Sequence, residues 1–372
     1  MIVGVRFIAP EFRPAQSSTK GAMNRAPTGC GAAIKNHRRT SAHIGVNRRF
    51  PNFSPNKMTP TLNTIRAAHT RIKPFIHRTP VITSAFINRE TGAEIFFKCE
   101  NFQKVGAFKA RGAANAIFSL DEAGAKRGVV THSSGNHGAA LAWAAQLRGI
   151  KATVVVPENA PQPKKNAIAG YGADIVFCAP NIAARQAAVD ALIAQHGFVM
   201  IHPFDNDDVI AGQGTAALEL LEDYPDLEVI IAPLGGGGLL SGTAIAAKAI
   251  KPNITVYGGE PSGADDGARS FASGVLVTEQ TPHTICDGLQ TVLAPRTFNI
   301  IRQHVDGIGV ASEESVVRAM RMIWQYTKII CETSCCPPLA AILEGALEVK
   351  AKRVGIILTG GNVDLDKLPW VK

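Results

Sequence analysis

Short apolar segments alternate with longer segments of helical period through much of this 372-residue chain. From residue 129 onward each apolar segment has the length of a buried strand, and each segment between them has the length of a helix. This alternation is typical of βαβ units, in which helices join parallel strands. The predicted strands cover 129–132, 152–156, 174–177, 199–201, 229–234, 255–258 and 354–358, and the predicted helices include 139–147, 163–169 and 182–196. The sequence therefore predicts an α/β protein with two parallel sheets.

Lys109 stands among small residues, in the segment GAFKARG at 106–112. A short buried strand is predicted before it, at 95–100, and a helix after it, at 113–118, so Lys109 lies near a strand-to-helix junction, where α/β proteins bind ligands. A polar, glycine-rich turn, SSGNHG at 133–138, follows within a helix's length. Its hydroxyls, amide and backbone N–H groups suit the binding of a carboxylate. A flexible surface turn is the alternative.

Four consecutive glycines, GGGG at 235–238, follow the predicted strand that ends at Leu234. A backbone without side chains can surround an anion, and N–H groups at a helix start favour a phosphate. A dinucleotide site is the alternative, since Glu260 lies about twenty residues further on, where a ribose-binding acid would stand. The glycine spacing contradicts that alternative, because Leu240 or Ser241 occupies the third glycine position of that motif. We expect a phosphate here, and a simple tight turn otherwise.

The FKARG segment at 108–112 and the SSGNHG segment resemble the paired signatures of the fold-type II pyridoxal-phosphate enzymes, in the serine racemase and serine/threonine dehydratase branch. The resemblance extends from about Met58 to Lys372. It implies an α/β fold like that of the tryptophan synthase β subunit, with the cofactor in the cleft between two parallel-sheet domains. It further implies a small domain at 128–205 and a large domain made of 58–127 and 206–372.

The resemblance also implies the roles of individual residues. Lys109 would bind pyridoxal 5′-phosphate covalently and remove the substrate Cα proton, and Ser134 would act as acid or base on the opposite face. The other implied cofactor contacts are Phe108 and Glu332 at the ring, Asn136 at the ring oxygen, Gly235, Gly236, Gly237 and Gly238 at the phosphate, and Thr359 at the pyridine nitrogen. The implied substrate contacts are Ser133, Ser134, Asn136, His137, Arg185 and Thr291. For Arg185, a solvated position on a helix is the alternative.

Two details of the resemblance bear on the reaction. His137 is typical of the dehydratases and racemases, whereas the cysteine synthase branch has threonine there. A hydroxyl at the pyridine nitrogen stabilises a carbanion less than an aspartate does, which favours elimination of a β-leaving group over transamination. After Glu332 the sequence departs from the family, with Thr333 in place of proline and Cys-Pro in place of small apolar residues.

The segment EPSGADD at 260–266 places two carboxylates beside a kinked backbone, and such oxygen ligands suit a hard cation. The resemblance implies that Glu260, Asp266 and the carbonyl of Ala264 bind Mg²⁺ or Ca²⁺, which would stabilise the large domain. A solvated acidic loop is the alternative.

Composition excludes several classes of protein. With 46% hydrophobic and 19% charged residues the chain is globular, and it contains no apolar run long enough to span a membrane. Seven cysteines without a Cys-x-x-Cys pair argue against a disulfide framework or a structural zinc site. We interpret the cluster of Cys331, Cys335 and Cys336 as core thiols rather than a metal or redox site. A reducing, cytoplasmic location is expected.

The net charge of +9 is confined to residues 1–57, which hold ten of the 39 Lys and Arg residues and a single acid, Glu11. The remaining 315 residues have a net charge of zero, so a basic face for nucleic acid is not expected. Three interpretations of 1–57 stay open: a disordered extension, a mitochondrial transit segment, or translated upstream sequence ahead of a start at Met58.

These observations predict a pyridoxal-phosphate-dependent ammonia-lyase that converts L-threonine or L-serine, or both, to a 2-oxo acid and ammonia. Serine racemase and 3-hydroxyaspartate dehydratase are the alternatives within the family. A non-catalytic α/β protein that binds an anion or a nucleotide is the alternative outside it. The expected partner is a small amino acid, and the expected assembly is a homodimer or a homotetramer.

Overall fold

The computed structural model describes residues 59–371, whose strands form two sheets. One sheet has the strand order β1-β2-β10-β7-β8-β9, and the other has the order β5-β4-β3-β6. Every neighbouring pair is parallel except β1 with β2. The strands are β1 Val81–Ile82, β2 Glu94–Cys99, β3 Val129–His132, β4 Ala152–Pro157, β5 Asp174–Cys178, β6 Val199–Met200, β7 Val229–Pro233, β8 Thr255–Pro261, β9 Gly307–Ala311 and β10 Arg353–Leu358.

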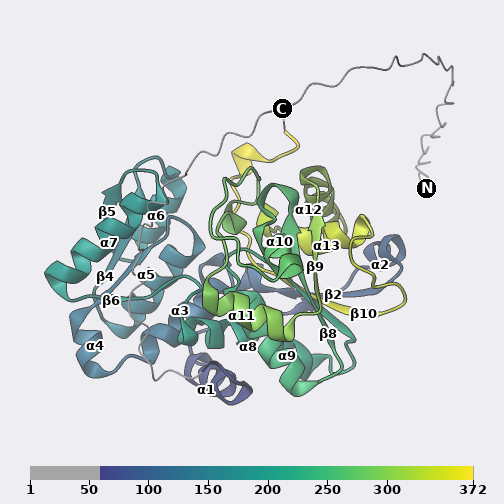
Figure 1. Cartoon of the computed structure of the whole chain (residues 1–372), viewed down its shortest axis with the longest axis horizontal. Coiled ribbons are helices and arrows are strands. Elements are labelled where there is room, and N and C mark those ends of the chain that lie inside the picture. The colour runs from purple at the N-terminus through teal and green to yellow at the C-terminus, as the bar shows by residue number, and fades with distance from the viewer. Residues whose placement is uncertain (1–58, 372) are drawn as a thin grey trace, which may run out of the picture. The chain divides into compact units, whose positions relative to one another are not determined.

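Helices connect these strands, as Figure 1 shows. The α-helices are α1 Leu62–Ile72, α2 Ala85–Thr91, α3 Lys109–Phe118, α4 Glu122–Arg127, α5 Asn136–Arg148, α6 Gln162–Gly170, α7 Ile182–His196, α8 Asp207–Asp223, α9 Gly238–Ile250, α10 Asp266–Ser273, α11 Pro295–His304, α12 Glu313–Thr327 and α13 Pro337–Leu343. Short 3₁₀ helices are η1 Glu100–Phe102, η2 Lys104–Gly106, η3 Ser262–Ala264, η4 Asp287–Leu289, η5 Thr333–Cys335 and η6 Leu365–Lys367. None of the described helices combines the length and the apolar character that a membrane crossing requires.

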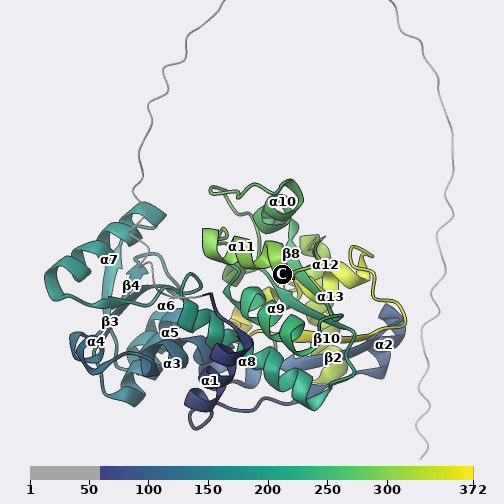
Figure 2. The same cartoon turned by 60° about the horizontal axis from the view of Figure 1, so that its bottom comes forward.

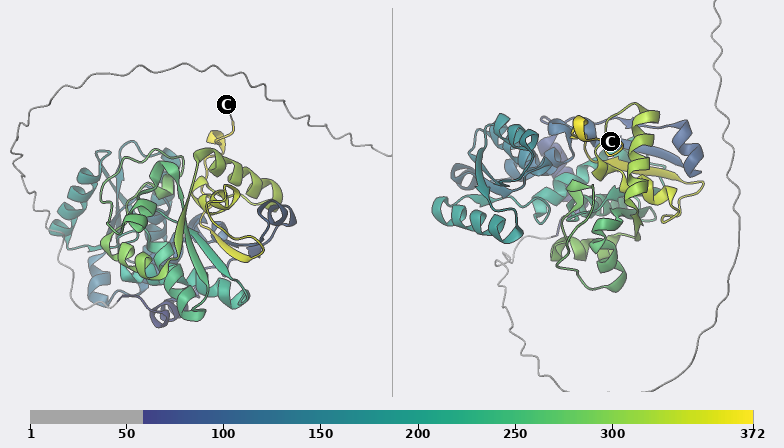
Figure 3. Two further views of the ribbon diagram at one scale, coloured as in Figure 1. Left: turned by 45° about the vertical axis from the view of Figure 1, so that its right-hand side comes forward. Right: turned by 90° about the horizontal axis from the view of Figure 1, so that it is seen from above.

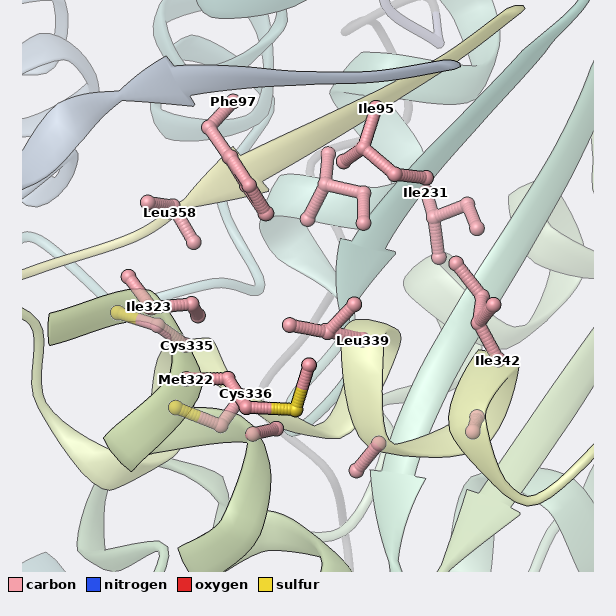
Figure 4. Close-up of a cluster of buried hydrophobic side chains, with 14 of the residues drawn as sticks. Ile95, Phe97, Ile231, Met322, Ile323, Cys335, Cys336, Leu339, Ile342 and Leu358 are labelled. Atoms are coloured by element: carbon pink, nitrogen blue, oxygen red, sulfur yellow. The ribbon is translucent and has the colours of Figure 1, made fainter. Parts of the chain in front are cut away.

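Helices cover both faces of the six-stranded sheet, because successive strand residues point to opposite faces. Ile95 and Phe97 of β2 pack into one apolar cluster with Leu339 and Ile342 of α13 (Figure 4). Phe96, between them, packs into a second cluster with α1, α8 and α9, which lie together in Figure 2. The apolar residues of both faces therefore bury most of the central strands β2, β10 and β7, whereas the edge strands β1 and β9 are only partly buried.

The four-stranded sheet follows the same rule. Val155 of β4 packs with Val189 of α7 on one face, whereas Val154 packs with Ile168 of α6 on the other. The helices start and stop at capping residues: the Asn181 side chain accepts from the third N–H of α7 at 2.8 Å, and Gly197 ends that helix at a φ of 70°.

Helix α3 contacts helices of both sheets, α8 from the six-stranded side and α5 from the four-stranded side. Figures 1 and 3 show the blue and teal elements of the four-stranded sheet beside the green and yellow elements of the other. Since α3 begins at Lys109, this lysine lies where the two sheets approach each other.

The structure confirms the alternating pattern predicted for 129–201, with helix ends moved by a few residues and the last strand one residue shorter. Two expectations change. Glu100 begins η1 rather than ending the preceding strand, and α3 begins at Lys109, ahead of the helix predicted from 113. The antiparallel edge strand β1 was not predicted. The domain boundaries at 128 and 205 stay a prediction, and all interpretations of 1–57 lie outside the described residues.

Candidate active site

Lys109 is held against the carboxyl end of β10. The N–H of Phe108 donates to the carbonyl of Thr359 at 2.9 Å, and Ala107 forms an antiparallel bridge with Gly360. These backbone contacts place the lysine at the edge of a parallel sheet where ligands of α/β proteins bind.

The amine of Lys109 lies in a partly buried position. Its Nζ donates to the carbonyl of Pro203 at 2.9 Å and lies 5.0 Å from the centre of the Phe108 ring. Burial lowers the pKa of Lys109 to about 8, although the Glu332 carboxylate opposes this shift. At pH 7 roughly one Lys109 in ten is then a neutral amine, against fewer than about one in a thousand for a free lysine. Only the neutral amine is nucleophilic, so the surroundings suit covalent chemistry.

Asn136, at the start of α5, is bonded to the six-stranded side of the structure. Its Nδ2 donates to both carboxylate oxygens of Glu332, at 3.0 and 3.2 Å, and its Oδ1 accepts from Asn362 Nδ2 at 2.9 Å. Burial, together with the charge of Asp287, raises the pKa of Glu332 to about 7, while the bond from Asn136 opposes the rise. The structure thus brings Asn136 and Glu332, both predicted cofactor contacts, together.

The predicted carboxylate-binding turn lies between β3 and α5. Ser133 Oγ accepts from the Gly135 N–H at 3.4 Å, and a Cβ at Gly138 would lie 2.2 Å from the Ser133 carbonyl, so glycine is required there. The Ser134 side chain is half-buried, and its hydroxyl has no hydrogen-bond partner within residues 59–371. This hydroxyl is therefore available to a substrate.

His137 is buried behind the turn, where it contacts protein and not solvent. Its Nε2 pairs with the carbonyl of Ile201 at 3.2 Å, and its Nδ1 has no partner within the described chain. Burial and the charge of Lys109 hold the pKa of His137 well below its usual value, so the ring is neutral.

Two further histidines near the site were not singled out from the sequence. His202 Nδ1 accepts from the N–H of Asp205 at 2.9 Å, and burial lowers the pKa of His202 to about 3. Its ring lies edge-on to that of His132, with centres 5.4 Å apart. The only sequence signal for them is their place at the carboxyl ends of strands: His132 ends β3, and His202 follows β6.

The four glycines at 235–238 are all buried, and α9 begins at Gly238. Gly237 has a φ of 86°, and a Cβ at Gly236 would lie 2.3 Å from the Phe204 ring, so neither position accepts a side chain. The Thr297 hydroxyl donates to the Gly236 carbonyl at 2.9 Å, which leaves that carbonyl paired. A tight backbone at a helix start fits a phosphate group.

Thr359 follows β10 and is buried beside Cys335. Its hydroxyl donates to Cys335 Sγ at 3.3 Å, and the Gly360 N–H donates to the same sulfur at 3.1 Å. The position of Thr359 next to the Lys109 turn agrees with its predicted place at the site.

The predicted substrate contacts Arg185 and Thr291 differ in their surroundings. Arg185, on α7, has a buried Nε without a hydrogen-bond partner in the described region. After burial itself, the charge of Arg185 contributes to lowering the pKa of His132, so the guanidinium lies near that histidine. Thr291 lies exposed in the loop before α11, and the described structure gives it no contact with the other predicted site residues.

The predicted metal ligands Glu260, Ala264 and Asp266 all lie buried at the end of β8. Glu260 accepts from the N–H groups of Gly267 at 3.2 Å and Ala268 at 2.7 Å. Asp266 accepts from Gln280 at 2.6 Å. Burial raises the pKa of both carboxyl groups, and for Glu260 the charge of Asp266 adds to the rise. Across residues 59–371 no group of three or more His, Cys, Asp or Glu side chains is arranged to hold a metal.

Sequence reasoning also missed a buried ion network two residues after Lys109. The Arg111 guanidinium is paired with Glu100 at 2.7 Å and with Glu219 at 2.8 Å, and Lys98 is paired with Glu219 at 2.7 Å. All four side chains are almost fully buried. The arginine of the FKARG segment was the available signal, but its acidic partners lie on other elements: Glu100 on η1, 11 residues earlier, and Glu219 on α8, 108 residues later.

The site residues present fit pyridoxal phosphate: Lys109 is partly neutral, Glu332 holds the side-chain amide of Asn136, and the buried backbone of Gly235–Gly238, the glycine cradle, suits a phosphate. Comparison with known proteins decides the question, because the family described as "Pyridoxal-phosphate dependent enzyme" matches residues 72–360. This chain belongs to that family.

Individual relatives of this pyridoxal-phosphate enzyme give a finer comparison than the family does. It is 52% identical over 314 residues to serine racemase of Dictyostelium discoideum, covering 83% of this chain and 97% of the relative. It is 48% identical over 311 residues to β-hydroxyaspartate dehydratase of Paracoccus denitrificans, covering 84% of this chain and 99% of the relative. The solved structure of maize serine racemase is similar at a TM-score of 0.81 and 45% identity, covering 83% of this chain and 95% of that one.

The comparisons confirm the predicted family, the α/β fold and an enzyme of the ammonia-lyase and racemase group. They do not support a non-catalytic binding protein. Threonine or serine dehydration, the main prediction, is only one of the activities named among the relatives, since the first of them are racemases and hydroxyaspartate lyases.

Proposed function

We propose that this enzyme eliminates water from β-hydroxy amino acids and releases a 2-oxo acid and ammonia. The observation that carries the proposal is the half-buried Lys109, whose amine is partly neutral near pH 7 and donates to the carbonyl of Pro203, the residue before Phe204, which lies against Gly236 and Gly238. A neutral amine at this position is a base as well as a nucleophile.

When bound, pyridoxal phosphate withdraws electrons from the substrate Cα and so acidifies its proton. The neutral Nζ of Lys109 would take that proton. The Ser133–Asn136 turn would hold the substrate carboxylate through backbone N–H groups and hydroxyls, and Gly235–Gly238 would hold the phosphate. The β-hydroxyl would leave as water with the equivalent of the proton removed from Cα, and the remaining enamine would hydrolyse with one water molecule to the 2-oxo acid and ammonia.

Among β-hydroxy amino acids, Arg185 favours 3-hydroxyaspartate. Arg185 is partly buried, its Nε is buried and lacks a partner within the described residues, and a buried N–H without an acceptor is costly. A second carboxylate on the substrate would supply the missing acceptor, and charge-assisted bonds of this kind are strong. The 3-hydroxyaspartate lyases among the relatives support this choice. L-Serine and L-threonine, the substrates predicted first, would bind without that bond.

Racemisation of serine is the second candidate, because the Ser134 hydroxyl is free to exchange a proton. A serine on the face opposite the lysine would return a proton to Cα and invert its configuration. The 52% identity to a serine racemase supports this interpretation.

We further propose that Glu260, Asp266 and the Ala264 carbonyl bind Mg²⁺ or Ca²⁺. Two buried carboxylates side by side repel each other unless a cation lies between them. Thermal denaturation of the holoenzyme with and without a chelator tests this: Tm is expected to fall with chelator and to recover with Mg²⁺ or Ca²⁺. An unchanged Tm would contradict the site.

Assembly and location remain proposals, the first based on the family resemblance and the second on the cysteine usage. We propose a homodimer or homotetramer, which sedimentation velocity distinguishes from a monomer. We propose a cytoplasmic location, or a mitochondrial one should residues 1–57 act as a transit segment; imaging of the full chain with a C-terminal fluorescent tag tests this.

Steady-state kinetics on L-threo-3-hydroxyaspartate, L-serine and L-threonine test the function. Release of 2-oxo acid and ammonia from at least one of them is expected, with the highest kcat/KM for 3-hydroxyaspartate. Arg185→Gln should lower kcat/KM for 3-hydroxyaspartate by about 10- to 100-fold, as loss of a charge-assisted bond does. The same variant should affect L-serine much less. Equal losses on both substrates would contradict a carboxylate-binding role.

A further inference from the structure

His202 follows β6 and begins the turn that leads into α8. Its half-buried ring closes this turn, since Nδ1 accepts from the N–H of Asp205 at 2.9 Å and from the N–H of Phe204 at 3.4 Å. A ring nitrogen that accepts carries no proton, so the neutral imidazole holds its proton on Nε2. Burial lowers the pKa of His202 to about 3, which keeps the ring in this form at physiological pH.

The two residues after His202 contact both halves of the predicted cofactor site. The carbonyl of Pro203 accepts from Lys109 Nζ at 2.9 Å. The Phe204 ring lies against the glycine cradle, because a Cβ added at Gly236 would lie 2.3 Å from this ring. The same turn therefore contacts the lysine and the cradle.

The peptide bond between Pro203 and Phe204 connects these contacts. It is trans and planar, so its C=O and its N–H point in opposite directions. His202 binds the N–H end of this plane, and Lys109 binds the C=O end. Rotation of the plane would break both hydrogen bonds together. The direction of the Pro203 carbonyl thus depends on the acceptor that His202 supplies.

Helix α11 holds the other end of the turn. Arg296 is paired with Asp205 at 3.0 Å and with Asp207 at 3.1 Å. The next residue, Thr297, donates to the Gly236 carbonyl at 2.9 Å. Because α11 fixes both the end of the turn and the cradle, His202 is the contact that fixes the beginning of the turn relative to the cradle.

We infer that His202 is a positioning residue that couples Lys109 to the glycine cradle through the turn at 202–205. The inference rests on the proposed function, in which Lys109 and the cradle bind one cofactor molecule. An amine donates through its N–H bonds and takes up a proton through its lone pair. The bond to Pro203 therefore restricts where the lone pair of Lys109 points. His202 thereby governs both the affinity for the cofactor and the rate of proton removal.

Three substitutions separate the acceptor from the ring. His202→Asn keeps an acceptor in place, because asparagine Oδ1 and histidine Nδ1 are both bonded to Cγ. His202→Gln carries the same amide one bond further out, and His202→Phe keeps a ring without an acceptor. The dissociation constant of pyridoxal phosphate, measured by visible absorbance, should rise about 5- to 20-fold in His202→Gln and His202→Phe, as loss of a buried acceptor predicts. His202→Asn should stay within about twofold of wild type.

Two further measurements on the holoenzyme report what a general loss of stability would not change. With saturating cofactor, kcat for L-threo-3-hydroxyaspartate should fall about tenfold in His202→Gln and His202→Phe, because the lysine is misdirected. KM should stay within about twofold, since the turn at 133–136 that would bind the substrate is untouched. The ³¹P resonance of the bound cofactor should shift in the same two variants and return to its wild-type position in His202→Asn.

His196→Phe is the matched control. The His196 ring lies 5.1 Å from the Phe198 ring, much as the His202 ring lies 4.6 Å from that of Phe204, but His196 is exposed at the end of α7. This substitution removes an imidazole beside a phenylalanine and should change neither the dissociation constant, nor kcat, nor the ³¹P resonance.

The outcomes distinguish this inference from the proposed function. If the wild type binds cofactor covalently while His202→Gln and His202→Phe match it in affinity and kcat, the inference is wrong and the function stands. If His202→Asn or His196→Phe loses as much as His202→Gln, the Nδ1 acceptor is not responsible and the inference is again wrong. Should His202→Phe not fold, the comparison of His202→Asn with His202→Gln decides alone. If the wild type binds no cofactor covalently, the proposed function fails first, and the inference fails with it.

Discussion

The side-chain amide of Asn136 donates to both carboxylate oxygens of Glu332, residues 196 positions apart in the chain. The bond joins α5, which packs on the four-stranded sheet, to the loop before η5 on the six-stranded side. It also fixes which end of the Asn136 amide carries the nitrogen, because a carboxylate accepts hydrogen bonds and does not donate them. Glu332, on the six-stranded side, thus orients Asn136, the residue predicted to contact the cofactor ring oxygen.

Glu332→Gln is expected to change how stability depends on pH. The wild-type carboxyl has its ordinary pKa of 4.5 when unfolded and about 7 when folded. Between these values the folded state binds more protons, so stability falls as pH rises through this window. In urea denaturation, the free energy of unfolding of the variant should rise relative to that of wild type by a few kcal/mol between pH 4.5 and 7. Above pH 7 the difference should not grow further. Glu314→Gln, on the exposed surface of α12, is the control; a pH-independent difference for Glu332→Gln would contradict the shifted pKa.

Lys109→Ala is expected to abolish the visible absorbance of covalently bound cofactor and to lower turnover by at least about 100-fold, since the variant loses both nucleophile and base. Borohydride reduction and peptide mapping of the wild type should place the pyridoxyl group on Lys109. Lys104→Ala, in the neighbouring η2, should retain both properties. A pyridoxyl group on another lysine would falsify the assignment.

Ser134→Ala should lower racemisation of serine by about 100-fold or more, as removal of an acid/base group does. Elimination from the L-isomer depends on the opposite face and should fall far less. Chiral chromatography and a 2-oxo acid assay on the same reaction mixture measure both. Ser133→Ala, whose hydroxyl caps the same turn, should reduce the two activities alike. A parallel loss in Ser134→Ala would mean that this serine only positions substrate.

Glu219→Gln should destabilise the protein by about 3–5 kcal/mol, because it leaves the buried charges of Lys98 and Arg111 without their shared partner. Glu222→Gln, on the same helix, breaks a pair that is nearly half exposed and should cost less than about 1 kcal/mol. Equilibrium denaturation of both variants measures the difference. Similar losses of unfolding free energy in Glu219→Gln and Glu222→Gln would show that the network is not effectively buried.

The stabilisation that Glu219 provides also depends on pH, in a direction set by its pKa. Burial alone would raise the pKa of Glu219, but the bonds from His69 and Arg111 and the charges of Arg111 and Lys98 lower it overall. A lowered folded pKa means that the stabilisation is present above the ordinary value of 4.5 and is lost as pH falls below it. The difference between wild type and Glu219→Gln should therefore shrink in acid.

Much of the fold could be predicted because it depends on local patterns. The strand β3 and the helix α7 have the predicted bounds, since apolar period and capping residues such as Asn181 and Gly197 act within a few positions of the chain. The edge strand β1 has only two residues, too few for a periodic signal. Its antiparallel pairing with β2 depends on neighbours that the local pattern does not specify.

The sequence by itself predicted the family, which the comparisons confirm, and singled out Lys109, the turn at 133–138 and the glycines at 235–238 as candidates, because such motifs reside in the backbone or in one residue type at a fixed spacing. The tertiary structure alone decided the pairing of Asn136 with Glu332, the Thr359–Cys335 bond and the neutral state of the buried His202. These properties depend on distance and desolvation between segments far apart in sequence, and the electrostatic energy of a group changes steeply with both.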